Sequence, residues 1–342
     1  MPQPRLIRIA TRRSPLAQIQ ARQVQQALCA AHGWDAARVP IIPLKTRGDN
    51  ISDDINKAIE NNKPLPPLAD IGGKGAFTEV FEQGLRAKQF DIAVHSLKDL
   101  PARLPDDLIL ACVPPRVDAR DALILAEGQK DGLESLSAPT QNETQIGTSS
   151  LRRKAQILAH YPNMQFQPLR GNIETRLAKL QQTKLHAPKL HAIVLAVAGL
   201  KRLGMAHVIS TILPPAIMLP AAGQGALGLQ TRADDRDLQA LLAPLHCPMS
   251  AACVTAERAF LAQFGGSCHM PIAAFVQYEN NMLQLTARLL AEDGQTCAEA
   301  KASAPLDQAE TLGKQIAEQI HKQAPDLVAA LSQVQQSSPI TK

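Results

Sequence analysis

Short apolar runs alternate with segments of helical periodicity along the first third of the chain. The pattern predicts strands at 6–10, 38–45 and 91–95, with helices at 15–31 and 77–87 between them. Strands that alternate with helices in this way form a mostly parallel sheet with helices on its faces. The first third is therefore expected to fold as an α/β unit.

The next third repeats the alternation, which predicts a second α/β unit. Its strands are expected at 121–126, 145–147 and 192–196, and its helices at 151–160, 172–182 and 199–203. Two proline-containing segments are the expected crossings between the two units, at 114–118 and 213–215.

The order of elements changes after Cys247. A helix is expected at 250–264, followed by strands at 271–278, 282–290 and 296–304 and a helix at 307–322. This order indicates a small α+β domain, and the polar tail from Ser332 is expected to fray. The expected domains are an α/β domain at 1–115 with 218–244, a second α/β domain at 116–217, and the α+β domain at 245–342.

The composition is that of an ordinary globular protein, with 45% hydrophobic and 20% charged residues. The formal charge of +5 comes from basic residues in separate turns, and aromatic residues make up 3% of the chain, so no nucleic-acid partner is expected. No stretch is apolar enough for a signal peptide or a membrane span. The sequence therefore predicts a cytoplasmic protein without a membrane partner.

Two glycine-rich segments match parts of nucleotide-binding motifs but lack their context. Segment 223–228 fits G-x-G-x-x-G without a strand–turn–helix around it, and segment 72–75 lacks the length and the Ser or Thr of a phosphate-binding loop. The run 56–67 mixes Lys, Asn and Pro without periodicity. It is expected to be a long mobile loop beside a glycine hinge at 71–75.

Three turns rich in Ser and Thr run into arginines, at 11–15, 148–153 and 169–176. Hydroxyls and free N–H groups at a helix start bind anions, helped by the helix dipole and by guanidinium groups. A single turn of this kind is more simply explained as a helix cap followed by a solvated arginine. Three of them together indicate a ligand with several negative groups.

An apolar strand delivers Ser96, Lys98 and Asp99 at its carboxyl end, which is where open α/β sheets bind ligands. Cations around Asp99 favour its ionised form, so its carboxylate is suited to hold a positive charge that develops on a substrate. The alternative is a surface aspartate in the turn before Pro101.

The six cysteines are scattered, without a C-x-x-C pair or zinc-ligand spacing, so neither disulfides nor a metal site is expected. Cys268 lies in the glycine-rich turn 265–269, where an accessible thiolate could act as a nucleophile. The alternative is a small residue that fills a tight turn. The adjacent His269 is expected to be a turn residue.

These features together resemble the porphobilinogen deaminase family, also called the hydroxymethylbilane synthases, over nearly the whole chain. The matching segments are 8–12, 14–17, 72–75, 91–96, 98–99, 147–153, 169–172, 196–204, 219–220, 223–225 and Cys268. The resemblance implies a three-domain α/β fold. Two doubly crossed α/β domains resembling periplasmic-binding-protein lobes are joined to a small α+β C-terminal domain.

The resemblance also implies the chemistry. The family joins four porphobilinogens, each with an acetate and a propionate, into hydroxymethylbilane, on the route to haem and other tetrapyrroles. A dipyrromethane cofactor attached by a thioether to the cysteine matching Cys268 primes the chain. Asp99 matches the catalytic aspartate, which contacts pyrrole N–H groups and stabilises the azafulvene cation left when ammonia departs. The enzyme is expected to be a monomer.

Further residues match family positions that bind the acidic side chains of the cofactor or the substrate. The cofactor-binding positions are Lys98, Thr148, Ser149, Ser150, Arg152, Arg153 and Arg170. The substrate-binding positions are Arg12, Ser14, Lys74, Ser96, Arg176, Arg202 and Gln224.

Parts of the chain depart from the family pattern. Asp70 stands where a lysine usually precedes the glycines of the mobile loop, and that loop is longer than usual. A lid lysine is therefore missing or moved to Lys57 or Lys63. His269 follows the cofactor cysteine where glutamine is common, so different contacts are expected around the attachment site.

Two other classes of function remain open. A two-lobed polycarboxylate-binding protein without catalysis would keep the arginine turns but would need neither Asp99 nor an exposed Cys268. A nucleic-acid-binding protein is the other class, and salt-sensitive binding to DNA or RNA would identify it.

Overall fold

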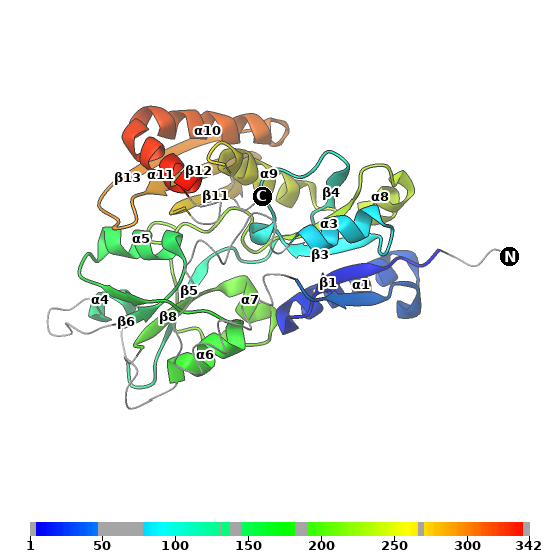
Figure 1. Ribbon diagram of the computed structural model, residues 1–342, viewed down its shortest axis with the longest axis horizontal. Coiled ribbons are helices and arrows are strands. Elements are labelled where there is room, and N and C mark those ends of the chain that lie inside the picture. Colours follow the sequence, from blue (N-terminus) through cyan, green and yellow to red (C-terminus); the bar gives the residue numbers. More distant parts are fainter. Residues whose placement is uncertain are drawn as a thin grey trace.

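The computed structural model describes residues 5–46, 78–129, 132–136, 145–181, 190–265 and 270–337. These residues form two five-stranded sheets and one three-stranded sheet, together with their helices. Figure 1 shows two α/β lobes, in blue to cyan and in green, with the third unit, in yellow to red, packed against them.

The first sheet has the strand order β2-β1-β3-β10-β4. Its strands are β1 (Ile9–Arg12), β2 (Ile41–Leu44), β3 (Ile92–Ser96), β4 (Leu108–Cys112) and β10 (Leu227–Arg232). β1 is parallel to β2 and β3, whereas β10 is antiparallel to β3 and β4, so β10 alone opposes the other strands. The sheet is mostly parallel, as predicted. Its helices are α1 (Pro15–His32), α3 (Glu79–Arg86) and α8 (Arg236–Leu242).

The second sheet follows the same plan, in the order β7-β6-β8-β5-β9. Its strands are β5 (Asp121–Leu125), β6 (Gln145–Gly147), β7 (Gln165–Gln167), β8 (Ala192–Ala196) and β9 (Thr211–Ile212). β6 is parallel to β7 and β8, and β5 opposes its neighbours β8 and β9. Its helices are α4 (Gly132–Leu136), α5 (Leu151–His160), α6 (Ile173–Gln181) and α7 (Val197–Arg202).

The two sheets are linked by two crossings of the chain. The chain passes to the second sheet between Cys112 and Asp121, and it returns between Ile212 and Leu227. Each crossing leads into the strand that is antiparallel to its neighbours, which is β5 in the second sheet and β10 in the first. Both proline-containing crossings predicted from the sequence lie within these segments.

The third unit is an antiparallel meander of β11 (Ile272–Glu279), β12 (Met282–Leu290) and β13 (Cys297–Ala304). Helices α9 (Pro248–Ala262) and α10 (Ala309–Gln323) pack together against it through one apolar cluster. This arrangement is the predicted α+β domain.

The prediction of a frayed tail from Ser332 is wrong for residues 332–337, because α11 (Pro325–Ser337) continues through them, and the rest of the tail lies outside the described residues. Val328 and Leu331, one helical turn apart, are buried in the apolar cluster of the third unit. Their burial anchors the last helix although the sequence beyond them is polar.

Short 3-10 helices connect several of these elements: η1 (Ala36–Arg38), η3 (Leu97–Asp99), η4 (Ala206–Val208), η5 (Ala243–Leu245) and η6 (Leu306–Gln308). Within the described ranges no single helix has the length and apolar character needed to cross a membrane. One pair, 236–245 with 248–262, meets that criterion only when both helices are counted together, and it is bent by 109°.

The turn between β12 and β13 packs against α5 of the second lobe. Gly294 in this turn has a φ of +74°, and a Cβ there would lie 2.5 Å from the Ala155 carbonyl oxygen and 2.6 Å from the Ala159 amide nitrogen. Only glycine combines this backbone conformation with so close an approach. The turn therefore fixes the third unit against the helix that begins at Leu151.

We expect Gly294→Ala to lower the free energy of unfolding by about 1–3 kcal/mol more than Gly204→Ala does. The two glycines have similar φ values, +74° and +72°, but a Cβ at Gly204 would meet no atom within 4 Å. The control variant therefore carries only the backbone strain, and the difference reports the clash with α5. Denaturant unfolding measures both losses, and equal losses would contradict a tight contact.

Candidate active site

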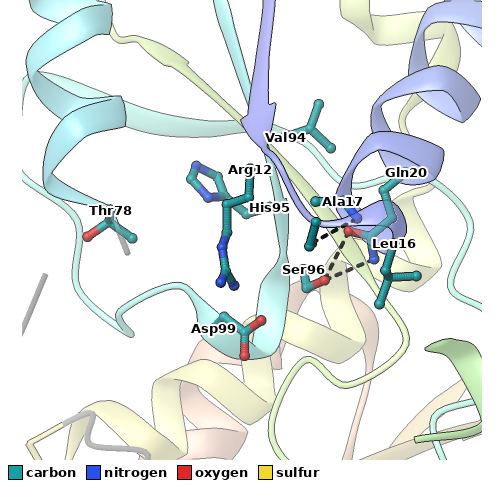
Figure 2. A pocket seen from close by; sticks show the side chains of 10 residues that line it. Arg12, Leu16, Ala17, Gln20, Thr78, Val94, His95, Ser96 and Asp99 are labelled. Carbon is teal, nitrogen blue, oxygen red and sulfur yellow. Dashed lines mark hydrogen bonds between the residues drawn. The ribbon is translucent and has the colours of Figure 1, made fainter. Parts of the chain in front are cut away.

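Strand ends and a helix start of the first lobe frame a pocket, shown in Figure 2. β1 ends at Arg12 and β3 ends at Ser96, while the Ser14 hydroxyl caps α1 by accepting from the Ala17 amide at 3.4 Å. The pocket is lined by Arg12, Ser14, Leu16, Ala17, Gln20, Thr78, Val94, His95, Ser96 and Asp99. Three predicted substrate-binding residues are thus brought together with the predicted catalytic aspartate.

Asp99 ends the 3-10 turn η3, directly after β3. Its side chain is exposed, and Figure 2 shows the Arg12 guanidinium directed toward its carboxylate. On the same side of the sheet, the Gln20 amide donates to the Ser96 hydroxyl at 2.9 Å. The carboxylate is therefore accessible to a ligand in the pocket, beside groups that can bind an anion.

His95 forms a wall of the pocket and does not suit the role of a base. Its Nε2 lies 2.9 Å from Oε1 of Gln230, and its ring meets Phe81 edge to face at 5.2 Å between centroids. Burial lowers the pKa of His95 to about 4, so the imidazole stays neutral near pH 7.

The hydroxyl turn of the second lobe leads into α5. Ser150 caps the helix, because its hydroxyl accepts from the Arg153 amide at 3.4 Å. The Thr148 hydroxyl accepts from the Ser150 amide at 3.2 Å, and the exposed Ser149 donates to the Leu169 carbonyl at 3.1 Å. The predicted helix start at Leu151 is confirmed, and Ser149 faces solvent at the end of β6.

Arg152 and Arg153 are each 6% exposed and pair with Asp121, which is fully buried. Nη1 of Arg152 lies 2.8 Å from one carboxylate oxygen and Nη2 of Arg153 lies 2.7 Å from the other. Nη1 of Arg152 also donates to the Leu219 carbonyl at 2.5 Å, and Nη1 of Arg153 donates to the Val194 carbonyl at 2.9 Å. Burial opposes ionisation of Asp121, but the two guanidinium groups outweigh it and hold its pKa below the usual range. These arginines are not solvated charges after a helix cap.

Gln224 links this ion cluster to the first lobe. Its Nε2 donates to Asp121 at 3.0 Å and to the Ala119 carbonyl at 2.6 Å, while its Oε1 accepts from Nζ of Lys98 at 3.3 Å. Burial lowers the pKa of Lys98 to about 8. One network therefore joins predicted site residues of both lobes.

The glycines beside Gln224 lie where the two crossings approach each other, and they do not form a nucleotide-binding loop. They precede β10, which begins at Leu227, so the strand follows the glycines instead of leading into them. Gly225 has a φ of +87°, and a Cβ there would lie 2.6 Å from the Val117 carbonyl oxygen. The two crossings thus meet backbone to backbone at this point.

Two further predicted arginines are held by backbone carbonyls. Nε of Arg176 donates to Gly171 at 2.8 Å, and Nη2 of Arg202 donates to Gly225 at 3.0 Å. Burial lowers the pKa of each guanidinium to about 10. Asp99 acts in the opposite direction on Arg176, so these charges of different lobes influence each other.

The remaining predicted site residues are less well defined by contacts. Arg170 is half-buried, and its carbonyl accepts from Nζ of Lys179 at 3.1 Å. The following features lie outside the described residues, and their roles stay predictions: Lys74, Cys268, His269, Asp70 and the 56–67 loop. In the part of the chain that the structure describes, no group of three or more His, Cys, Asp or Glu residues could hold a metal ion.

Sequence reasoning missed Asp121 as a member of the site. The residue opens β5, where the chain enters the second sheet, and its partner Arg153 is 32 positions away. The one available signal is an acidic residue at the start of an otherwise apolar strand.

Comparison with known proteins identifies relatives for nearly the whole chain. A family model described as "Porphobilinogen deaminase, dipyromethane cofactor binding domain" matches residues 7–240, and one described as "Porphobilinogen deaminase, C-terminal domain" matches residues 251–322. The chain is 44% identical to a porphobilinogen deaminase of Chromobacterium violaceum over 324 residues, 94% of this chain and 97% of that protein. It is 42% identical to one of Paraburkholderia phymatum over 334 residues, 96% of this chain and 94% of that protein.

Solved structures add a weaker likeness. An ABC transporter protein from Parabacteroides distasonis is 12% identical, with a TM-score of 0.38 and coverage of 95% of each chain. So low a score carries no functional weight.

We expect Asp121→Asn to lower the free energy of unfolding by about 3–5 kcal/mol near pH 7, because two buried guanidinium groups lose their counter-charge. Since the pKa of Asp121 is lowered on folding, its contribution is fully present above the unfolded pKa of about 4. The contribution is lost as pH falls through the folded pKa. The gap in melting temperature between parent and variant should therefore narrow on acidification below about pH 4.

The control is Asp107→Asn, which removes an ion pair with Arg86 at 2.6 Å in which both side chains are exposed. Solvent screens this pair, so its loss should change the melting temperature little. Melting curves of the parent and both variants across the acid range test the prediction. Equal shifts in the two variants, or a gap that does not change with pH, would contradict it.

Proposed function

The chain belongs to the porphobilinogen deaminase family, and we propose that the site described above carries out that family's reaction. The protein is a transferase of tetrapyrrole biosynthesis that acts on porphobilinogen and uses a dipyrromethane cofactor. The proposal concerns the finer steps. These are carbon–carbon bond formation between successive porphobilinogens with loss of ammonia, attachment of the cofactor to Cys268, and hydrolytic release of hydroxymethylbilane.

One observation carries the proposal: the site holds desolvated cations that form no ion pair among the described residues. These are Lys98, Arg176 and Arg202, and burial lowers the pKa of each. Each is held by an amide or carbonyl oxygen, which orients its charge without neutralising it. Bound carboxylates would stabilise these cations, so the donor set fits a ligand with several carboxylates.

The residues proposed to hold the dipyrromethane carboxylates lie mostly in the second lobe: Lys98, Thr148, Ser149, Ser150, Arg152, Arg153 and Arg170. Asp121 offsets only one of the two charges of its arginine pair, so that cluster keeps a net positive charge. When bound, dipyrromethane supplies the terminal pyrrole to which the first substrate is joined. The protein contributes the cations that hold its acidic side chains.

Asp99 is proposed to stabilise the cation that forms on porphobilinogen. As ammonia leaves, the bond between the methylene carbon and nitrogen breaks with its electron pair on nitrogen, and positive charge develops on the substrate beside the carboxylate. A carbon–carbon bond to that methylene carbon completes the step, and a proton leaves the newly joined pyrrole carbon. Arg12 and Ser14, in the same pocket, are proposed to bind substrate carboxylates.

Asp99→Asn should lower turnover by about 10²–10³, because it removes a preorganised charge that faces the developing cation. The melting temperature should be unchanged, since the side chain is exposed. The matched control is Asp106→Asn, which alters an exposed aspartate in the loop that follows. Porphobilinogen consumption by cofactor-loaded protein is the measurement, and parental turnover in Asp99→Asn would show that the assignment is wrong.

Attachment of the cofactor at Cys268 predicts an intact mass above the sequence mass by two linked pyrrole units. Peptide mapping should place the addition on Cys268, and Cys268→Ala should lose both the addition and activity. Cys297→Ala removes an exposed cysteine of the third unit and should keep both. An active preparation with unmodified Cys268 would contradict the attachment. An inactive, unmodified protein that still binds small polycarboxylates would favour the non-catalytic alternative.

A further inference from the structure

Arg258, on α9 of the third unit, holds the segment that directly follows Asp99. Its Nη1 donates to the Leu100 carbonyl at 3.2 Å, and its Nη2 donates to the carbonyls of Pro101 at 2.6 Å and Ala102 at 3.1 Å. Three consecutive carbonyls of the first lobe thus converge on one guanidinium of another unit. Burial lowers the pKa of this group to about 10, still high enough to keep it charged near pH 7.

The backbone around Asp99 has little regular structure of its own. Asp99 ends a single 3-10 turn, and the Leu100 amide donates to the Leu97 carbonyl at 3.2 Å to close it. The next strand, β4, begins only at Leu108. A carboxylate on such a turn keeps a fixed position only if other parts of the protein hold the backbone, and Arg258 supplies three of those contacts.

α9 is itself fixed to its surroundings at the preceding residue, Glu257, which is fully buried. Its carboxylate accepts from Arg116 at 2.7 Å, from the Gly223 amide at 2.7 Å and from the Val276 amide at 2.8 Å. These donors belong to the first crossing, the second crossing and β11. The helix is therefore placed against both crossings and its own sheet at once.

We propose that Arg258 is a positioning residue for Asp99: it fixes where the carboxylate lies in the site without itself touching the substrate. The inference rests on the role proposed above for Asp99. The third unit also contains Cys268, six residues beyond the end of α9.

Arg258→Met, measured on the cofactor-loaded enzyme, tests the proposal. The kcat for porphobilinogen consumption should fall about 10- to 100-fold, with KM within about twofold, because a misplacement of about 1 Å at a catalytic group can cost ~10² in rate. Arg258→Lys should give an intermediate kcat, since an ammonium keeps the charge but does not span three carbonyls. Parental kcat in Arg258→Lys would overturn the proposal even if the methionine variant does not fold.

The matched control is Arg232→Met. Arg232 is buried and, like Arg258, donates to backbone carbonyls, those of Leu85 at 3.1 Å and Phe90 at 3.3 Å. It also pairs with Asp235 at 2.6 Å, and it lies at the end of β10 away from the site. This variant should have a lower melting temperature than the parent. The kcat of its folded, cofactor-loaded fraction should stay within about twofold of the parental value. A merely structural role for Arg258 predicts the same pattern for Arg258→Met, and that result would overturn the inference.

A double variant separates the two possible failures. In an Asp99→Asn background, Arg258→Met should lower kcat by less than about threefold further, because the group that it positions has already been disabled. If Arg258→Met lowers kcat by the same factor in the Asp99→Asn background as in the parent, Arg258 does not act through Asp99 and the positioning role is overturned. The role proposed for Asp99 itself would be unaffected. Parental turnover in Asp99→Asn alone would instead overturn the proposed function itself.

Discussion

The ion cluster of Asp121, Arg152 and Arg153 is the interaction on which the rest of the site depends. All three side chains are buried, and a buried charge that loses its partner is strongly destabilising. Because Asp121 opens β5 and the two arginines lie in the first turn of α5, the cluster requires a crossing, the second sheet and a helix start to meet at one point. Gln224, on the returning crossing, donates to the same carboxylate at 3.0 Å. Both crossings are thereby tied to the site.

The third unit completes this arrangement because it contacts both lobes. On the first lobe, its residue Arg258 donates to the carbonyls that follow Asp99. Its residue Glu257 accepts a hydrogen bond from Arg116 of the first crossing. On the second lobe, Arg288 of β12 donates to the Gln156 side chain at 3.2 Å and to the Ala216 carbonyl at 2.9 Å, near the turn that packs on α5. Gln156 in turn donates to the carbonyls of Arg152 at 3.2 Å and Leu219 at 3.1 Å. A contact at the edge of the third unit is therefore two hydrogen bonds away from the buried ion cluster.

Strongly patterned elements could be predicted from the sequence, and long-range polar pairs could not. Segments 145–147, 151–160, 192–196 and 282–290 form β6, α5, β8 and β12 at the predicted bounds. β10 was not predicted, because it follows glycines and contains Gln230, Thr231 and Arg232, all buried. Asp121 is marked only as an acidic residue at the start of an apolar strand, and its partners could not be predicted, since Arg153 and Gln224 lie 32 and 103 positions away. The arginine turns were expected to face a ligand, but the tertiary structure turns Arg152 and Arg153 toward a carboxylate of the protein.

Four arginines of the site are therefore of two physical kinds. Arg152 and Arg153 share a carboxylate, which neutralises part of their charge and makes them structural elements as well as ligand-binding candidates. Arg176 and Arg202 are held by carbonyls, whose dipoles align a guanidinium but leave its full charge. The second kind is desolvated and oriented before any ligand arrives. An incoming carboxylate then meets a charge whose position is already set, so less of the binding energy is lost to ordering the protein.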